Sequence, residues 1–381
     1  MSHNYVINIL FPFYLEDNLA AHNRINSYID VLLQNNYRVN LFGLTKVYKK
    51  EWCLSDLTRE KYIYHIPHQQ FPKNNFVKRA LNELMFSYKL VKASKKVLAD
   101  VTLITSPSMF LVPLASNVDN NIADIRDIQW EYLNDSILKK ILKGWMLKSL
   151  KKYNKVIVTN LSEKEIFKDY SPEIIPNGIS LDKYQKIRNK INSVNNSTTK
   201  DSEKDNVVTY IGNLGFAQNI LTLAQVAKSL PNIKFYIIGN GVQYQEIVEY
   251  KEKNKIENLF ILGELKWEEI LPYYIKSTIL FAQLKKEFSI AMPSKLYEYA
   301  ITGKPILYAG VGEGANFVKQ LENGYVCEPL NKDECIKHIL NILEDNNIKL
   351  SSKNANLIKK KYIREDNSLK LLEIIENLKD V

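Results

Sequence analysis

The chain has 381 residues, of which 45% are hydrophobic and 25% are charged, and its formal net charge is +10. This composition excludes a disordered chain, a fibre and a multi-span membrane protein, and the length allows two to three domains with full cores. The positive charge favours a polyanionic partner: nucleic acid, an anionic bilayer or a phosphorylated ligand. The three cysteines have no CxxC spacing, which indicates neither a disulfide framework nor a zinc site and favours a reducing cytoplasm.

The first half of the sequence alternates short apolar runs with amphipathic patterns. Apolar runs at 5–13 and 38–44 flank a helical pattern at 21–35, so we expect the chain to open with a strand, not a signal peptide. Further strands are predicted at 101–105, 121–125 and 156–159. A strand–helix–strand alternation of this kind is typical of an α/β fold with a doubly wound sheet.

A polar stretch at 187–206 has almost no large apolar residue, and we interpret it as a flexible linker. It separates an amino-terminal domain, 1–186, from a second α/β domain at 207–360. A basic helix at 361–381 is expected to close back toward the first domain. Two such domains place a cleft between the carboxyl ends of their sheets, where ligands usually bind.

Three short motifs carry candidate chemistry. IPNGIS (175–180) and YIGNLGFAQ (210–218) contain turn signals, and in isolation a plain turn explains either of them. In the third, Pro293 and Ser294 precede a predicted helix that carries Lys295 and Glu298. Its first turn suits a diphosphate, and the carboxylate suits ribose hydroxyls; the alternative is an ordinary amphipathic helix.

The order of these motifs resembles the carboxyl-terminal domain of family 4 GT-B glycosyltransferases. The matching segments are VIVTNLSEKEIF, IIPNGISLDKY, YIGNLGFAQNI, FYIIGNGVQYQEI, LFILGELKWEEILPYY and PSKLYEYAITGKPI. PSKLYEY and GNLGxxQ resemble a branch that builds bacterial surface polysaccharides such as O-antigen and capsule. ADVTLITSPS and IADIRDIQW extend the resemblance into the first half. It implies a GT-B fold, with two Rossmann-like doubly wound domains facing a central cleft.

The resemblance implies a donor site in the second domain. Glu298 matches the ribose-binding glutamate of an E-x7-E motif, but Ile290 replaces the first glutamate. Asn213 and Gln218 replace the usual Arg and Lys, so Lys295, and after it Lys286, is expected to hold the diphosphate. The implied donor-binding residues are Gly212, Asn213, Gly215, Gln218, Gly263, Glu264, Leu265, Lys286, Ser289, Ile290, Ala291, Pro293, Ser294, Lys295 and Glu298.

On the acceptor side the resemblance points to Arg126 and Asp127 as catalytic residues, with a structural ion pair as the alternative. Asp17, Asn18, His22 and Arg24 take the place of the family's acceptor loop, although surface decoration also explains His22.

The resemblance implies a retaining transferase with front-face attack and no metal cofactor. No DxD, HExxH or Cys/His cluster is found in the sequence. The expected reaction moves a hexosyl or N-acetylhexosaminyl group from a UDP-sugar to a lipid-linked saccharide. Alternatives are an inactive nucleotide-sugar-binding assembly partner and a nucleotide-sugar 2-epimerase. A nucleic-acid partner is not expected, because no recognisable reading module is present.

Two basic stretches, 71–96 and 136–153, combine lysines with apolar and aromatic residues. Such helices suit an anionic membrane surface, and the alternative is a helix whose apolar face is core. The sequence thus predicts a cytoplasmic protein, peripheral on the inner face of a bacterial inner membrane.

Overall fold

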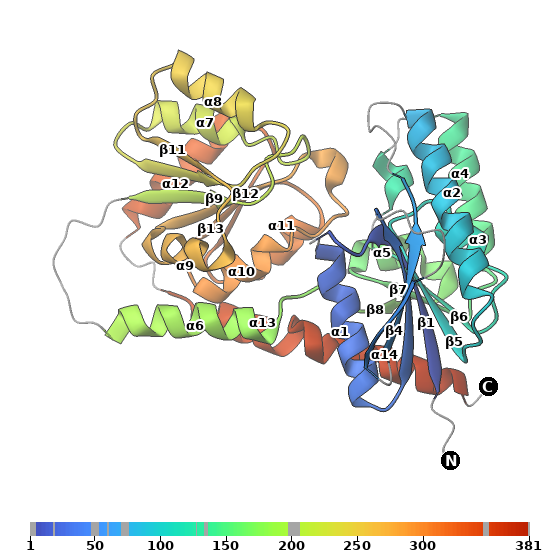
Figure 1. Cartoon of the computed structure of the whole chain (residues 1–381). Helices are drawn as coiled ribbons and strands as arrows, with labels where there is room; N and C mark the ends of the chain where they lie inside the picture. The colour runs from blue at the N-terminus through green and yellow to red at the C-terminus, as the bar shows by residue number, and fades with distance from the viewer. Residues whose placement is uncertain are drawn as a thin grey trace. The chain divides into compact units, whose positions relative to one another are not determined.

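In a computed structural model the chain forms two compact units: unit 1, Met1–Asn177 with Arg364–Val381, and unit 2, Gly178–Ile363 (Figure 1). The structure describes residues 5–17, 20–46, 53–58, 61–69, 76–126, 128–132, 136–196, 206–345 and 350–379.

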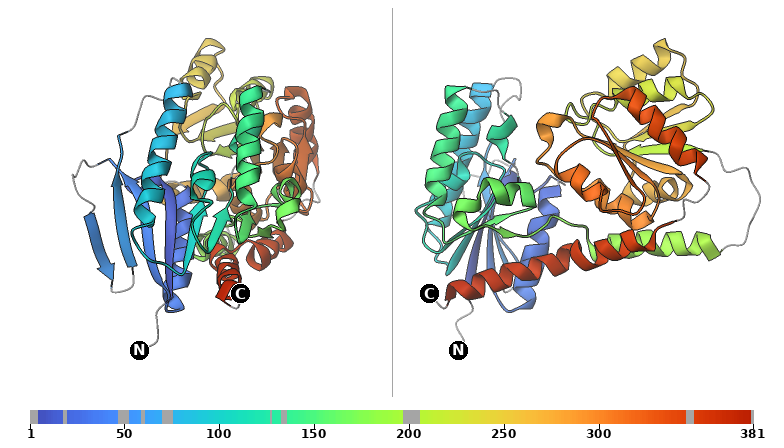
Figure 2. Two further views of the ribbon diagram at one scale, coloured as in Figure 1. Left: turned by 90° about the vertical axis from the view of Figure 1, so that its right-hand side faces the viewer. Right: turned by 180° about the vertical axis from the view of Figure 1, so that it is seen from behind.

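Unit 1 is built on a sheet with the strand order β3-β4-β2-β1-β5-β6-β7-β8. The strands are β1 (Val6–Tyr14), β2 (Arg38–Thr45), β3 (Cys53–Thr58), β4 (Lys61–Pro67), β5 (Val101–Thr105), β6 (Asn121–Asp124), β7 (Lys155–Val158) and β8 (Glu173–Ile174). All neighbours are parallel except β3 and β4, an antiparallel pair at one edge of the sheet (Figure 2). The sequence did not predict this pair.

Helices cover both faces of this sheet. They are α1 (Ala20–Gln34), α2 (Phe76–Ser94), α3 (Leu111–Ala115), α4 (Ile137–Leu150), α5 (Leu161–Ile166) and α14 (Arg364–Lys379), with 3-10 turns η1 (Gln129–Tyr132) and η2 (Lys168–Tyr170). In α1, Ile25, Ile29 and Leu32 share one face and are buried. The same core includes Leu371 and Ile375 of α14, so the end of the sequence completes unit 1.

Unit 2 contains a second sheet, in which all neighbouring strands are parallel, with the order β11-β10-β9-β12-β13-β14. The strands are β9 (Val207–Ile211), β10 (Lys234–Ile238), β11 (Leu259–Gly263), β12 (Ile279–Gln283), β13 (Ile306–Ala309) and β14 (Gly324–Cys327). The strand order reverses between β9 and β12. At such a point, loops diverge at the carboxyl edge and leave room for a ligand.

The helices of unit 2 are α6 (Leu181–Asn196), α7 (Leu221–Ser229), α8 (Tyr244–Lys253), α9 (Trp267–Lys276), α10 (Lys295–Thr302), α11 (Glu313–Val318), α12 (Lys332–Glu344) and α13 (Ser352–Lys361), with a 3-10 turn η3 (Lys286–Phe288). Two apolar cores lie on the two faces of the sheet. The alternation predicted for 207–360 is therefore present.

The linker predicted at 187–206 is wrong for its first half, because residues up to Asn196 belong to α6. Tyr184, Ile187 and Ile191 recur every three or four positions and are buried in a core of unit 2. This sparse apolar face was hidden by the surrounding polar residues. The change of unit falls earlier, after Asn177, and residues 197–205 lie outside the described part.

The chain passes between the units twice, at 177–178 and at 363–364. On the unit 2 side the two passages pair as a β-bridge between Ile179 and Ile363, and the Ile179 amide donates to the Tyr362 carbonyl at 2.8 Å. On the unit 1 side, Arg364 Nε donates to the Asn177 carbonyl at 3.1 Å. In each unit, the residues at the two passages are therefore held to each other by hydrogen bonds within that unit.

Candidate functional site

Two glycine turns meet at the carboxyl edge of the unit 2 sheet. Gly212 follows β9 with φ +146°, and Gly239 follows β10 with φ +141°, a region that side chains rarely adopt. A Cβ at Gly239 would lie 1.9 Å from the Gly212 carbonyl oxygen. The Gly212 amide donates to the Ile238 carbonyl at 2.8 Å. Backbone thus packs directly on backbone where the two turns meet.

Lys295, the first residue of α10, lies against Gly212. Its Nζ is 1.7 Å from the position that a Cβ on Gly212 would take, so the missing side chain makes room for the ammonium group. Nζ donates to the Tyr210 hydroxyl at 3.1 Å and lies 4.4 Å from the centre of that ring. Burial lowers the pKa of Lys295 to about 8, and the charge of Glu298 offsets part of this effect. Among the described residues, no carboxylate forms an ion pair with it.

Glu298 lies one turn further along α10, with a hydrogen bond to one carboxylate oxygen and a more distant lysine near the other. The Tyr274 hydroxyl of α9 donates to Oε2 at 2.5 Å, and Lys183 Nζ of α6 lies 3.6 Å from Oε1. The Glu298 side chain is 21% exposed, whereas Tyr274 is 1% exposed. The carboxylate therefore reaches the surface while its inner oxygen is anchored.

The start of α10 follows the predicted pattern only in part. Ser294 occupies the N-cap position, but its side chain accepts no hydrogen bond from the helix. The Leu296 amide donates instead to the Pro293 carbonyl at 3.1 Å. The exposed Ser294 hydroxyl is thus left to solvent or a ligand.

The segment before α10 corrects one expectation. The resemblance implies that Ser289, Ile290 and Ala291 bind the donor, and their backbone amides are the groups that would line the sugar–phosphate site. The Ser289 amide donates to the Lys286 carbonyl at 3.1 Å, and the Ala291 amide to the Phe288 carbonyl at 3.0 Å. The amides of Ser289 and Ala291 are thus used by the carbonyls of the preceding 3-10 turn, η3, and do not face a ligand. Ile290 is half-buried there, and the Lys286 side chain is exposed.

The turn after β9 contains Asn213, Gly215 and Gln218. The Asn213 carbonyl accepts from the Tyr210 hydroxyl at 2.6 Å, and its amide side chain donates to Gln218 Oε1 at 3.5 Å. The sequence analysis missed Gln283, the buried last residue of β12. Its amide donates to the carbonyls of Gln218 and Asn219 at 2.9 and 2.7 Å. A polar residue ending the apolar strand ILFAQ was the available signal.

The turn at the end of β11 lies next to these residues. The Gly263 carbonyl accepts from the Gly239 amide at 2.7 Å, and Gly263 has φ +69°. Glu264 is exposed and Leu265 is half-buried. Contacts therefore link the turns of Gly263, Gly239 and Gly212 to Lys295, and α10 carries Glu298 alongside.

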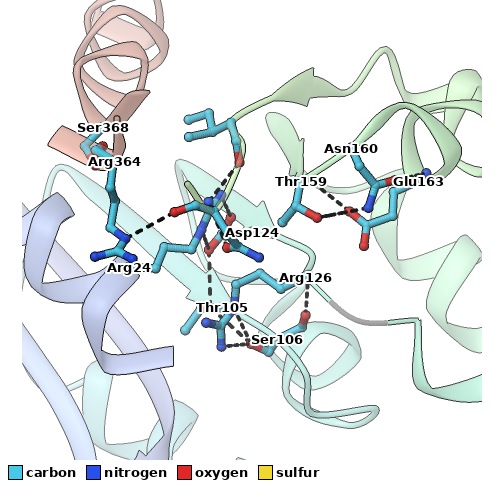
Figure 3. Close-up of polar contacts among 12 residues, drawn as sticks. Arg24, Thr105, Ser106, Asp124, Arg126, Thr159, Asn160, Glu163, Arg364 and Ser368 are labelled. Atoms are coloured by element: carbon cyan, nitrogen blue, oxygen red, sulfur yellow. Dashed lines mark hydrogen bonds and ion pairs between the residues drawn. The ribbon is translucent and has the colours of Figure 1, made fainter. Parts of the chain in front are cut away.

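In unit 1 the predicted acceptor residue Arg24 is buried, and this corrects its assignment. Its guanidinium group forms a two-pronged ion pair with Asp124, at 2.8 and 3.2 Å, and the two side chains are 2% and 0% exposed (Figure 3). It also donates to the Ile175 carbonyl at 2.8 Å and to Asn177 Oδ1 at 3.3 Å. The arginine fills a structural role because its donors are directed at unit 1 itself.

Arg126 is fastened to the end of β5. Its Nε and Nη2 donate to the Ser106 carbonyl at 3.1 and 2.6 Å, and its amide donates to Ser106 Oγ at 2.8 Å (Figure 3). The neighbouring catalytic candidate, Asp127, lies outside the described residues, as does Asn18.

Of the remaining acceptor candidates, Asp17 pairs with Lys46. His22 Nε2 lies 2.9 Å from the Tyr14 carbonyl, to which it donates. Both side chains are thus engaged within unit 1.

Two helices of unit 1 expose apolar side chains beside lysines. In α4, Ile137 is 78% exposed and Ile141 61%, and in α2, Leu81 is 55% exposed and Tyr88 57%. Lys140, Lys148 and Lys151 lie in or beside α4. The apolar residues of α4 therefore do not all face the core, because Ile137 and Ile141 are exposed to solvent. Within the described residues no helix is long and apolar enough to cross a membrane, and no group of three His, Cys, Asp or Glu side chains is placed to hold a metal ion.

Comparison with known proteins finds a matching family model and solved structures of similar fold. Residues 191–364 match the family model of glycosyl transferases group 1. Sucrose-phosphate synthase of Thermosynechococcus elongatus superposes with a TM-score of 0.76 at 14% identity, covering 98% of this chain and 99% of that one. An E. coli structure described as trehalose-6-phosphate bound with UDP-2-fluoro glucose gives 0.72 at 10% identity, covering 97% and 98%. WaaG, a glycosyltransferase involved in lipopolysaccharide biosynthesis, gives 0.68 at 13% identity, covering 97% and 99%.

The chain has the GT-B fold. The predicted class of two Rossmann-like units is thus confirmed. An uncharacterized glycosyltransferase of Methanocaldococcus jannaschii is 22% identical over 190 residues. This alignment covers 50% of the chain and 53% of the relative, so the chain spans about half the length of the curated protein it matches. The family match falls on the unit that carries Lys295 and Glu298, and it supports a glycosyltransferase.

Proposed function

We propose that the chain is a retaining glycosyltransferase that moves a hexosyl or N-acetylhexosaminyl group from a UDP-sugar. The observation that carries this proposal is the Lys295 ammonium group, which lies beside Gly212 at the carboxyl edge of a parallel sheet and pairs with no carboxylate in the described part of the chain. A half-buried cation of this kind is stabilised by a diphosphate. Glu298, one turn away and partly exposed, is placed to accept hydrogen bonds from ribose hydroxyls.

Lys295 then stabilises the negative charge that develops on the leaving diphosphate, and the open turn at Gly212 lets the phosphates approach. The fold neighbour bound with UDP-2-fluoro glucose supports the choice of a UDP-linked donor. With front-face attack the leaving phosphate helps to take the acceptor's proton, so no covalent nucleophile is required.

Calorimetric titration of UDP, with GDP as the comparison nucleotide, tests this donor site. We expect micromolar UDP binding, weakened about tenfold or more, roughly 1.4 kcal/mol, by Glu298→Ala. Glu287→Ala, which removes an exposed carboxylate from the preceding 3-10 turn, is the matched control. Failure of the folded wild type to bind UDP would contradict the donor assignment. UDP binding without transfer from any UDP-sugar would favour the inactive binding partner.

We further propose that the acceptor is a lipid-linked saccharide of bacterial surface polysaccharide synthesis, such as O-antigen or capsule, at the inner face of the inner membrane. The exposed apolar residues and lysines of α2 and α4 support this, since such faces bind anionic bilayers. The similarity to WaaG is in keeping with such an acceptor.

Co-sedimentation with phosphatidylglycerol vesicles tests the membrane part of the proposal. We expect binding that falls with salt and is lost in Ile141→Glu on α4. Leu369→Glu, at a residue of α14 that is 47% exposed, should leave it unchanged. Equal binding by both variants would contradict the role of α4.

A further inference from the structure

The carboxylate of Glu298 is not simply displayed at the start of α10 but is held by a second helix. Tyr274 of α9 is 1% exposed, and its hydroxyl donates to Glu298 Oε2 at 2.5 Å. Among the described residues, this is the only hydrogen bond of that hydroxyl. A buried phenol needs a partner, so the bond ties the side chain of Tyr274 to that of Glu298.

The ring of Tyr274 is itself fixed from behind. It packs edge-on against Tyr299, with 6.0 Å between the ring centres. The Tyr299 hydroxyl accepts from the amide of Ile211, the last residue of β9, at 2.9 Å. A chain of rigid contacts thus runs from the sheet edge to the inner oxygen of the carboxylate.

The outer oxygen is held much less firmly. Lys183 Nζ lies 3.6 Å from Oε1, beyond hydrogen-bond distance, and its side chain is 36% exposed. The same ammonium group lies 5.4 Å from the centre of the Trp267 ring, with which it makes a cation–π contact. A ligand hydroxyl therefore meets one anchored oxygen and one that is easily released.

We propose that Tyr274 is a positioning residue for the recognition of ribose: by fixing Oε2 it sets the plane of the Glu298 carboxylate so that both ribose hydroxyls find an acceptor. This inference rests on the proposed function, since it takes a nucleoside diphosphate as the ligand. A carboxylate accepts about four hydrogen bonds, so the one from Tyr274 leaves room for two hydroxyls. The effect of Tyr274 must then depend on those hydroxyls.

The test compares UDP with 2′,3′-dideoxy-UDP, which lacks both ribose hydroxyls, by calorimetry. We expect the wild type to prefer UDP. We expect Tyr274→Phe to weaken UDP about five- to tenfold while leaving the affinity for dideoxy-UDP unchanged, so that the preference is largely lost. Tyr273→Phe is the matched control, because this neighbour on α9 makes no hydroxyl hydrogen bond among the described residues. It should behave as the wild type does.

Two results overturn the inference while leaving the donor site intact. One is an equal loss of affinity for both nucleotides in Tyr274→Phe, which indicates a general structural role. The other is an unchanged preference for UDP in that variant. Absence of UDP binding in the folded wild type has a different meaning, because it overturns the proposed function and this inference with it.

Discussion

Each unit withdraws a cation from full contact with solvent, Arg24 being buried and Lys295 half-buried, and the two cations differ in their surroundings. Arg24 of unit 1 is paired with Asp124, and two further acceptors take its remaining donors. Burial alone lowers the pKa of Arg24, but the charge and hydrogen bond of Asp124, together with the charges of Tyr28 and Glu163, outweigh this effect, so its pKa is raised.

Among the described residues, Lys295 of unit 2 forms no ion pair with a carboxylate; its ammonium group donates to the Tyr210 hydroxyl and lies over that ring. Burial lowers its pKa to about 8, although the charge of Glu298 acts in the other direction. A buried cation with its own counter-ion serves the fold, whereas a half-buried one without a counter-ion is suited to an incoming anion.

The strongest test of this contrast removes the paired cation. Arg24→Met leaves the Asp124 carboxylate buried without its counter-ion, with a hydrogen bond from the Thr105 hydroxyl at 3.3 Å, which we expect to lower the free energy of unfolding by about 3–5 kcal/mol. Denaturant titration measures the loss. Arg24→Met with Asp124→Leu removes both charges and should recover much of it. A loss below about 1 kcal/mol in the single variant would show that the ion pair does not hold unit 1 together.

Removing the Lys295 cation should raise the stability of the protein and lower its affinity for UDP, whereas removing Arg24 should lower the stability. Lys295→Met takes away a charge that is half-buried at a cost, so we expect the free energy of unfolding at pH 7 to rise by about 1 kcal/mol. The affinity for UDP should fall about tenfold or more, because the diphosphate loses this cation. Thermal unfolding and calorimetry on the same preparation check both parts. A clear loss of stability in this variant would remove the contrast with Arg24.

The same lysine predicts a pH dependence. Only its protonated form attracts a diphosphate, so we expect the affinity for UDP to fall about tenfold between pH 7 and pH 9, across the pKa of about 8. Stability should change in the opposite direction. The unfolded chain keeps this proton up to about pH 10, so between pH 8 and pH 10 it binds more protons than the folded chain, and folding becomes more favourable as the pH rises. Lys295→Met should show neither change; a similar fall of affinity in that variant would assign the titration to another group.

The smallest effect is expected at the second candidate lysine. Lys286 is exposed on η3, where its charge is screened by water and salt, so Lys286→Ala should change UDP affinity by less than about threefold. Calorimetry at low and at 0.5 M salt checks this. An effect as large as that of Lys295→Met would make the exposed lysine the main phosphate ligand.

The fold was predictable from the sequence where a strand or helix is decided by its own residues. The apolar runs of β5, β7 and β9 predict buried parallel strands. The first half of the linker was predicted wrongly because α6 buries only every third or fourth side chain, and its polar majority resembles a loop.

The sequence motifs predicted which residues lie in the candidate site, but not which side chains those residues contact. PSKLYEY placed Lys295 and Glu298 on one helix, as the structure shows. Nothing in the local sequence revealed that Tyr274, which lies 24 positions earlier, donates to Glu298. Arg24 was misassigned for the same reason, since its partner Asp124 is 100 positions away. Contacts of this length depend on the packing of elements that sequence periodicity does not resolve.

The arrangement in which α14 completes the core of unit 1 has a consequence for synthesis. Leu371 and Ile375 are translated only after the whole of unit 2. While the ribosome synthesises unit 2, the face of α1 that Leu371 and Ile375 will cover remains exposed to other chains. Unit 2 is continuous in sequence and is free to form first, so unit 1 starts to be made before unit 2 and is completed after it.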